Sequence, residues 1–226
     1  MKFSEMKYSR PNLEDVQKLV GSALEKFGAA KSADDAFKAY EEIDTEFARF
    51  TTMGCLAFIR HSLDTTNEFY SAEQDYFDEV TPLIEELNQE VKKVLVNTPY
   101  RSELEREWGK QLFLNTEIQM KTFSPEIIPL MQEENKLSTE YDKLIASVQI
   151  EYDGKTLTLA QLEPYHLDVN AEVRRASWNA RAAWFEEHKE RLDSLFDELV
   201  KVRTKMAVTL GYKNYIELGY YRMTRN

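Results

Sequence analysis

Apolar residues recur at alternating steps of three and four through most of this chain, and that spacing is typical of amphipathic helices. The longest such run covers residues 168–211, where Val173, Trp184, Leu195 and Met206 fall on one stripe. We therefore predict one long helix over residues 169–210. At 1.5 Å per residue it would be about 60 Å long, which is more than a small domain needs and favours a place in a larger body.

Polar residues and glycines mark the expected helix ends. Asn170 can cap the long helix, Glu172 lies in its first turn, and Gly211 is placed to end it in the left-handed conformation. The same reasoning predicts earlier helices over residues 13–27, 33–63, 72–96 and 124–148, and one or two shorter helices within 101–123.

Three residues inside these helices carry separate expectations. Gly54 indicates either a close contact with another helix or a break. Pro82 predicts a kink or a late start of its helix, because proline lacks the N–H and crowds the preceding turn. Cys55, the only cysteine, lies in an apolar run and is expected to be a buried small residue rather than a reactive thiol.

The hydrophobic period changes from 3.6 to two at Val148. Residues 148–152 alternate, Asp153-Gly154 is a strong turn signal, and residues 155–158 complete a return strand. The fold class that follows is mostly α: a multi-helix bundle with one long helix and a single small β-hairpin over residues 148–158.

Composition agrees with a mostly α fold and argues against some classes of partner. Only 7 Gly and 6 Pro in 226 residues favour long helices with few connections. We expect an N-terminal helical region, residues 1–123, and a second region, residues 124–226, that contains a helix, the hairpin and the long helix. A net charge of −11 argues against a nucleic-acid partner. Neither a secretory leader nor a membrane span is predicted, so we expect a cytoplasmic protein without a membrane partner.

The histidines do not form a metal motif. Zinc peptidases place two histidines one helical turn apart in H-E-x-x-H, whereas His61, His166 and His188 are widely separated here. Glu163 and His166 match a single Glu-x-x-His with Pro164 inside it, and we expect His188 to be an interior or interface histidine. The sequence therefore assigns no catalytic residue and no metal ligand.

The candidate binding residues are four tyrosines near the C-terminus: Tyr212, Tyr215, Tyr220 and Tyr221. Tyrosines serve as hydrogen-bond donors and as platforms for ligands. The alternative is that they are packing residues, which is the usual role of tyrosines at helical spacing.

The hairpin segment VQIEYDGKTLTLAQL, the helix start with Val173-Arg174-Arg175-Ala176, and the final run VRTKMAVTLGYKNYIELGYYRMTRN occur in a familiar order. This order resembles the N-terminal portion of oligoendopeptidase F, of the thimet-oligopeptidase-like zinc metallopeptidase family. The most specific pieces are residues 153–158 and residues 203–215.

The resemblance implies a helical, clam-like endopeptidase that cuts short peptides in a deep channel. The present residues would supply channel walls, and the zinc with its H-E-x-x-H helix would belong to a C-terminal catalytic region outside this chain. The chain would then be a fragment that is inactive alone and binds no zinc.

Two alternatives remain open. One is a free-standing helical protein-binding or scaffold module without enzymatic activity. The other, a metal protein of the four-helix type, is disfavoured by the single Glu-x-x-His.

Overall fold

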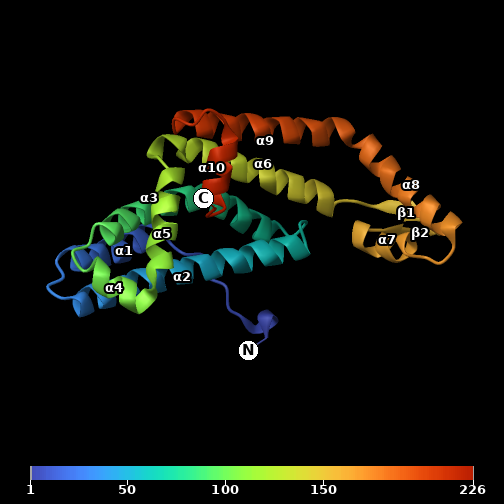
Figure 1. Cartoon of the computed structure of the whole chain (residues 1–226). Helices are drawn as coiled ribbons and strands as arrows, with labels where there is room; N and C mark the ends of the chain where they lie inside the picture. The colour runs from blue at the N-terminus through green and yellow to red at the C-terminus, as the bar shows by residue number, and fades with distance from the viewer. Residues whose placement is uncertain (1, 226) are drawn as a thin grey trace.

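The computed structural model describes residues 2–225, which form an elongated helical body with an arm at one end (Figure 1). In chain order the elements are η1 (Phe3–Glu5), α1 (Leu13–Gly28), α2 (Ala33–Leu63), α3 (Glu68–Val96), α4 (Arg101–Trp108), α5 (Lys110–Gln119), η2 (Met120–Thr122), η3 (Pro125–Ile127), α6 (Ile128–Ala146), β1 (Ile150–Tyr152), β2 (Lys155–Leu157), α7 (Leu159–His166), α8 (Ala171–Glu187), α9 (Lys189–Thr209) and α10 (Tyr215–Arg222). Helices hold 79% of the chain, so the prediction of a mostly α fold with one small hairpin is confirmed.

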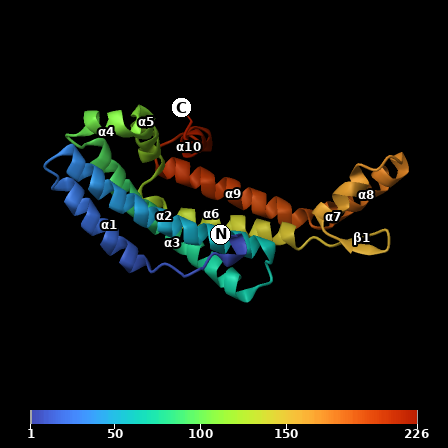
Figure 2. The same cartoon turned by 90° about the horizontal axis from the view of Figure 1, so that it is seen from below.

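Five helices lie in a row in the order α1, α2, α3, α6 and α9, each in contact with the next (Figure 2). The apolar stripes of α1, α2 and α3 share one core, which includes Val20, Ile43 and Phe77. A second core joins α6, α9 and α10 and includes Leu130 and Met206. Helix α6 therefore connects the two halves of the body, and the division between residues 123 and 124 stays a prediction.

Side-chain caps set most helix starts, as the sequence predicts. The side chains of Asn12, Ser32 and Asn170 accept hydrogen bonds from backbone N–H groups in the first turns of α1, α2 and α8, at 3.1, 3.1 and 2.9 Å. The predicted start of the third helix at residue 72 is wrong. Asn67 caps α3 instead, so the helix begins a turn earlier.

Helix α3 runs unbroken across Pro82, so the late helix start that this proline allowed in the sequence is excluded. Proline cannot donate to the carbonyl four residues earlier, which here belongs to Asp78. The side-chain amide of Asn135 on α6 donates to that carbonyl at 3.0 Å. A neighbouring helix thus supplies the hydrogen bond that the proline removes.

The segment predicted as one helix over residues 169–210 is two helices, α8 and α9, separated by His188. His188 has φ −98° and ψ 8°, and the ribbon bends at this point (Figure 1). Its Nδ1 lies 2.9 Å from the carbonyl oxygen of Trp184, and its ring stacks on the indole at 3.9 Å. The side chain therefore shares the carbonyl that its own backbone N–H also binds. At the other end Gly211, with φ +87°, closes α9 as predicted.

The hairpin has the predicted position. Asp153 and Gly154 both have positive φ, 52° and 68°, as a two-residue type I′ turn requires, and Tyr152 pairs with Lys155. The hairpin, α7 and α8 form the arm, residues 150–187, which packs around Trp184 and Leu162.

Gly54 marks a close helix contact and no break. A Cβ at this position would lie 3.3 Å from the Phe77 ring of α3. Cys55 is exposed, contrary to expectation. It directly follows Gly54, so its side chain points about 100° further around α2 than the position that contacts Phe77.

Among residues 2–225 no helix is long and apolar enough to span a membrane.

Candidate functional site

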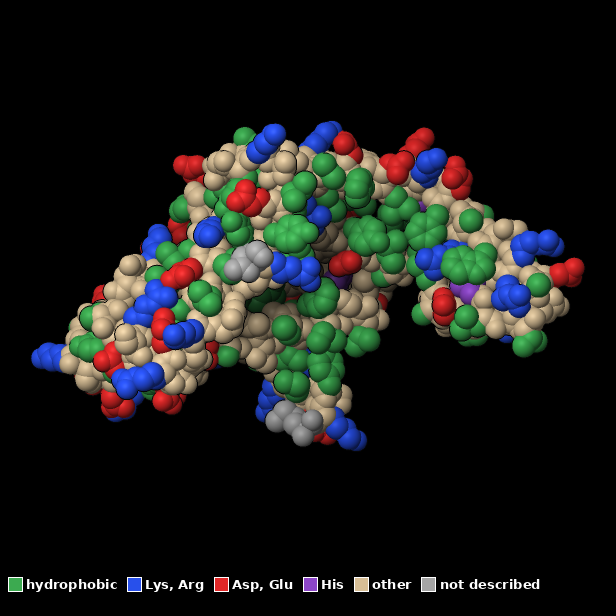
Figure 3. All heavy atoms as spheres, in the orientation of Figure 1, with side chains coloured by type: hydrophobic (Ala, Val, Ile, Leu, Met, Phe, Trp, Pro, Cys, Tyr) green, Lys and Arg blue, Asp and Glu red, His purple; other side chains and the backbone are tan. Residues whose placement is uncertain are grey.

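The arm extends away from the joined ends of α2 and α3 (Figure 1), and the space-filling view shows a hollow between them (Figure 3). Figure 3, in the same orientation, shows hydrophobic side chains gathered above this hollow. A pocket of about 260 Å³ lies where α2, α3 and α6 meet. Ile145 lines this pocket and also packs against the core of the arm, so the pocket lies at the base of the arm.

His61 is the central polar residue of this pocket, which we call the His61 pocket. Its side chain comes from α2, the residue is only 3% exposed, and neither ring nitrogen has a hydrogen-bond partner among the described residues. Burial lowers the pKa of His61, as does the nearby Lys143 ammonium, so the neutral imidazole is favoured. One nitrogen of a neutral imidazole donates and the other accepts.

Three acidic residues act to raise the pKa of His61, against the larger effect of burial: Asp75, Asp78 and Asp142. Asp78 is buried in α3, where it accepts hydrogen bonds from Gln74 at 2.8 Å and Thr139 at 2.7 Å. Burial raises the pKa of Asp78, against the lowering effect of these hydrogen bonds. Asp142 lines the pocket from α6 and is exposed, so the pocket has an acidic edge open to solvent.

A second cluster of charges surrounds Glu134 in α6, whose side chain is 7% exposed. Arg203 of α9 donates to it at 2.7 Å, and Arg222 of α10 donates at 2.7 and 3.1 Å. Burial raises the pKa of Glu134, but the two guanidinium groups outweigh it and hold the pKa below its ordinary value. This acid joins three helices and holds α10 against the body.

The four predicted tyrosines lie on or just before α10 and do not converge on one cavity. The hydroxyl of Tyr212 donates to the Lys121 carbonyl at 2.8 Å, and that of Tyr221 to Glu217 at 3.1 Å. Arg222 donates to the hydroxyl of Tyr215 at 2.8 Å. Three of the four tyrosine hydroxyls therefore have hydrogen-bond partners within the chain. Tyr220 is 53% exposed.

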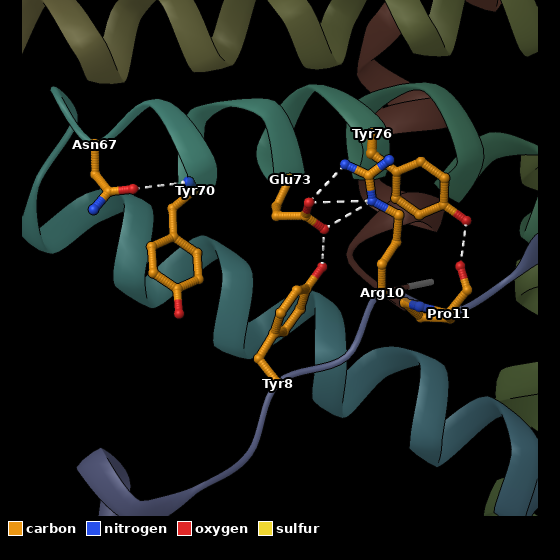
Figure 4. A network of polar contacts seen from close by, with 7 residues as sticks. All are labelled: Tyr8, Arg10, Pro11, Asn67, Tyr70, Glu73 and Tyr76. Atoms are coloured by element: carbon orange, nitrogen blue, oxygen red, sulfur yellow. Dashed lines mark hydrogen bonds and ion pairs between the residues drawn. The ribbon is translucent and has the colours of Figure 1, made fainter.

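A third polar network holds the segment before α1, which includes Tyr8, Arg10 and Pro11, against α3 (Figure 4). Arg10 makes a two-point contact with the buried Glu73 through Nε at 2.9 Å and Nη2 at 2.6 Å, and Tyr8 donates to the same carboxylate. Arg10 lowers the pKa of Glu73 more than burial raises it. Tyr76 donates to the Pro11 carbonyl at 2.6 Å. These contacts anchor the chain before α1 begins.

The described residues contain no group of three or more His, Cys, Asp or Glu side chains arranged to hold a metal ion. His166 and His188 each have a partner, Ser177 Oγ at 2.8 Å and the Trp184 carbonyl at 2.9 Å. His188 is half-buried, and its interior or interface role stays a prediction.

The place of His61 in a pocket was not predicted from the sequence, nor was the burial of Asp78, Glu73 and Glu134. A signal was available, because a titratable side chain within an apolar stripe must be partnered or functional. Glu134, for example, lies four residues after one buried leucine of α6 and three before another.

A family model for the peptidase M3 N-terminal domain matches residues 3–123. A protein described as an oligoendopeptidase F superposes with a TM-score of 0.97 at 44% identity, covering 100% of this chain and 40% of that chain. PZ peptidase A with an inhibitor gives 0.96 at 45% identity, with 100% and 40% covered.

A third structure, described as an oligoendopeptidase F from Bacillus anthracis str. Ames, gives a TM-score of 0.96 at 43% identity, covering 100% of this chain and 42% of that chain. A comparison with curated proteins found no match. The chain thus spans about two-fifths of the length of the solved structures it matches.

The helical fold and the whole-chain superpositions define this chain as a domain of the peptidase class. More specifically, it belongs to the peptidase M3 N-terminal domain family, whose model covers more than half of its length. The predicted resemblance to oligoendopeptidase F is confirmed.

Proposed function

We propose that this chain is the N-terminal part of a cytoplasmic zinc metalloendopeptidase that hydrolyses short peptides. In the longer protein, called the parent below, the chain forms helical walls of a deep channel that excludes folded proteins by size. The observation that carries this proposal is the superposition of the entire chain on peptidase structures more than twice its length, at 43–45% identity.

The zinc and the catalytic residues of the parent belong to a C-terminal catalytic region outside residues 1–226. This assignment is supported by the separation of the three histidines and by the lack of a metal-holding cluster among the described residues. The bound metal would supply Lewis-acid activation of water. The proposed role of the present chain is to position the peptide and to restrict access to the channel.

The hollow between arm and bundle is the surface we assign to the peptide path. It is supported by the apolar side chains above the hollow and by the His61 pocket at the base of the arm. The four tyrosines at α10 are a second proposed peptide contact. Because the hydroxyls of Tyr212, Tyr215 and Tyr221 are engaged within the chain, their contact with a peptide would be through ring faces.

Two measurements test the assignment. The purified 226-residue chain is expected to contain no stoichiometric zinc and to show no turnover of peptides. The native coding region beyond Asn226 is expected to continue and to encode H-E-x-x-H. Stoichiometric, catalytically competent zinc in the chain alone would refute the proposal, and a stop codon directly after Asn226 would favour a helical binding module instead.

A further inference from the structure

The His61 pocket contains an unsatisfied hydrogen-bonding group of a kind that few folded proteins leave without a partner. His61 is 3% exposed and both its ring nitrogens lack a partner among the described residues. An unpaired buried polar atom is destabilising, because it loses its hydrogen bonds to water without replacing them. The other two histidines differ, since each has at least one hydrogen bond within the chain. His61 lines the pocket, and its buried ring nitrogens have no partner among the described residues.

The shape of the pocket favours a small organic group over water alone. Its volume is about 260 Å³, whereas one water molecule occupies about 30 Å³ of liquid. Phe58, Ile145 and Ala146 provide apolar walls, and most of the exposed lining is carbon. An apolar side chain of moderate size matches this lining.

The polar groups favour a neutral ligand with one donor and one acceptor. A neutral imidazole offers one of each, which complements the C=O and N–H of an amide. The acidic residues Asp78 and Asp142 near the ring disfavour an anion, and the Lys143 ammonium beside the pocket is already paired with Asp75 at 3.8 Å. No metal cluster exists among residues 2–225.

We propose that the His61 pocket binds one apolar residue of a peptide, with the imidazole hydrogen-bonded to a backbone amide of that residue and its side chain against Phe58, Ile145 and Ala146. The inference rests on the proposed function in one respect, since it takes the ligand to be a peptide. It assigns His61 a role in recognition and gives the pocket a preference for aliphatic or aromatic residues over glycine.

A titration of the 226-residue chain tests this directly. The probe is N-acetyl-L-leucinamide, which carries one apolar side chain and two amides, and the readout is the ¹⁵N resonances of labelled histidine rings. The ring resonances of His61, identified by their loss in His61→Leu, are expected to shift saturably. N-acetylglycinamide, without the side chain, is expected to bind at least tenfold more weakly.

Two variants separate pocket binding from non-specific effects. Ala146→Leu fills the pocket from the exposed end of α6, leaves the histidine in place, and is expected to weaken the probe at least tenfold. His188→Gln changes a histidine of the arm–α9 junction outside the pocket and is expected to leave probe binding unchanged. No saturable shift at His61, or equal binding in Ala146→Leu, would overturn the proposal.

The parent enzyme provides a readout that distinguishes the two proposals. With a peptide series that differs in a single side chain, leucine against glycine, His61→Leu is expected to reduce the preference in kcat/KM at least fivefold. If the parent hydrolyses peptides and His61→Leu leaves every preference intact, the pocket assignment fails and the proposed function stands. If the parent hydrolyses no peptide, the proposed function fails, and the titration alone decides whether the pocket binds amides.

Discussion

Individual buried charges determine how the helices of this chain are joined. Glu73, Asp78 and Glu134 are each 6% exposed or less, and each receives hydrogen bonds from another element. A buried acid that loses its partners keeps its desolvation penalty without compensation. These positions are therefore more sensitive to substitution than the many exposed ion pairs.

Replacing Glu134 by alanine is expected to lower the free energy of unfolding by about 2–3 kcal/mol, because it leaves two arginines unpaired. This figure is below that for a fully buried pair, since the Arg203 and Arg222 side chains are 39% and 31% exposed. Lys38→Ala, at an exposed pair with Asp34, is the control and should change stability by about 0.5 kcal/mol or less. Urea unfolding measures both, and equal effects would contradict this account.

The pH dependence of the same variant has a definite sign. The folded-state pKa of Glu134 lies below its ordinary value of 4.5. Its ionised form therefore stabilises the protein above pH 4.5, and this contribution is lost as the pH falls through the folded-state pKa. Glu134→Ala should unfold with a shallower acid dependence than the wild type.

The lowered pKa of His61 leads us to expect a second change of stability, at higher pH. Its pKa is lowered by burial and by Lys143, while Asp75, Asp78 and Asp142 oppose this. The unfolded chain binds a proton near the ordinary value of 6.5 and the folded chain only at lower pH. Stability is therefore expected to fall from about pH 7 to about pH 5, and less so in His61→Leu. Parallel pH profiles of unfolding for the two proteins would exclude this.

At the scale of elements, the boundary and turn signals in the sequence were the most successful predictors. Caps at Asn12, Ser32 and Asn170, the C-terminal Gly211 and the Asp153-Gly154 turn depend on interactions within a few residues, so local sequence specifies them. The unbroken course of α3, the break at His188 and the positions of the buried acids depend on contacts made by distant residues. Those features required the structure.

Asn135 is the clearest case of such a distant contact. Asn135→Ala is expected to cost about 1–3 kcal/mol, because the Asp78 carbonyl loses the donor that replaces the N–H missing at Pro82. The cost should shrink in a Pro82→Ala background, where a backbone N–H is restored. A double-mutant cycle measured by urea unfolding gives the coupling. Additive effects would show that Asn135 does not compensate for the proline.

Two glycines should respond in opposite directions to alanine. Gly154 has φ +68°, so Gly154→Ala is expected to cost about 1–2 kcal/mol in the hairpin turn. Gly21 lies inside α1, where a Cβ would meet no heavy atom within 4 Å, so Gly21→Ala should stabilise by about 0.5–1 kcal/mol. Thermal unfolding measures both, and a neutral Gly154→Ala would contradict the assigned turn.

At the scale of the molecule, the body and the arm border a hollow, and the His61 pocket lies at the base of the arm. The row of five helices provides a rigid support, and the arm is held to it by the ends of α6 and α9 through Ile145 and Leu192. This arrangement is suited to bordering a channel in a larger protein. The resemblance in the sequence leads to the same proposed role, but the pocket itself was not predicted.

The most direct test of this role is hydrolysis by the purified parent protein. Short quenched-fluorescent peptides and a folded protein containing the same cleavable sequence are compared under one condition. The account predicts rapid cleavage of the peptides, loss of that cleavage with a zinc chelator, and no cleavage of the folded protein. A parent that leaves the peptides intact, or cleaves the folded protein equally well, would contradict it.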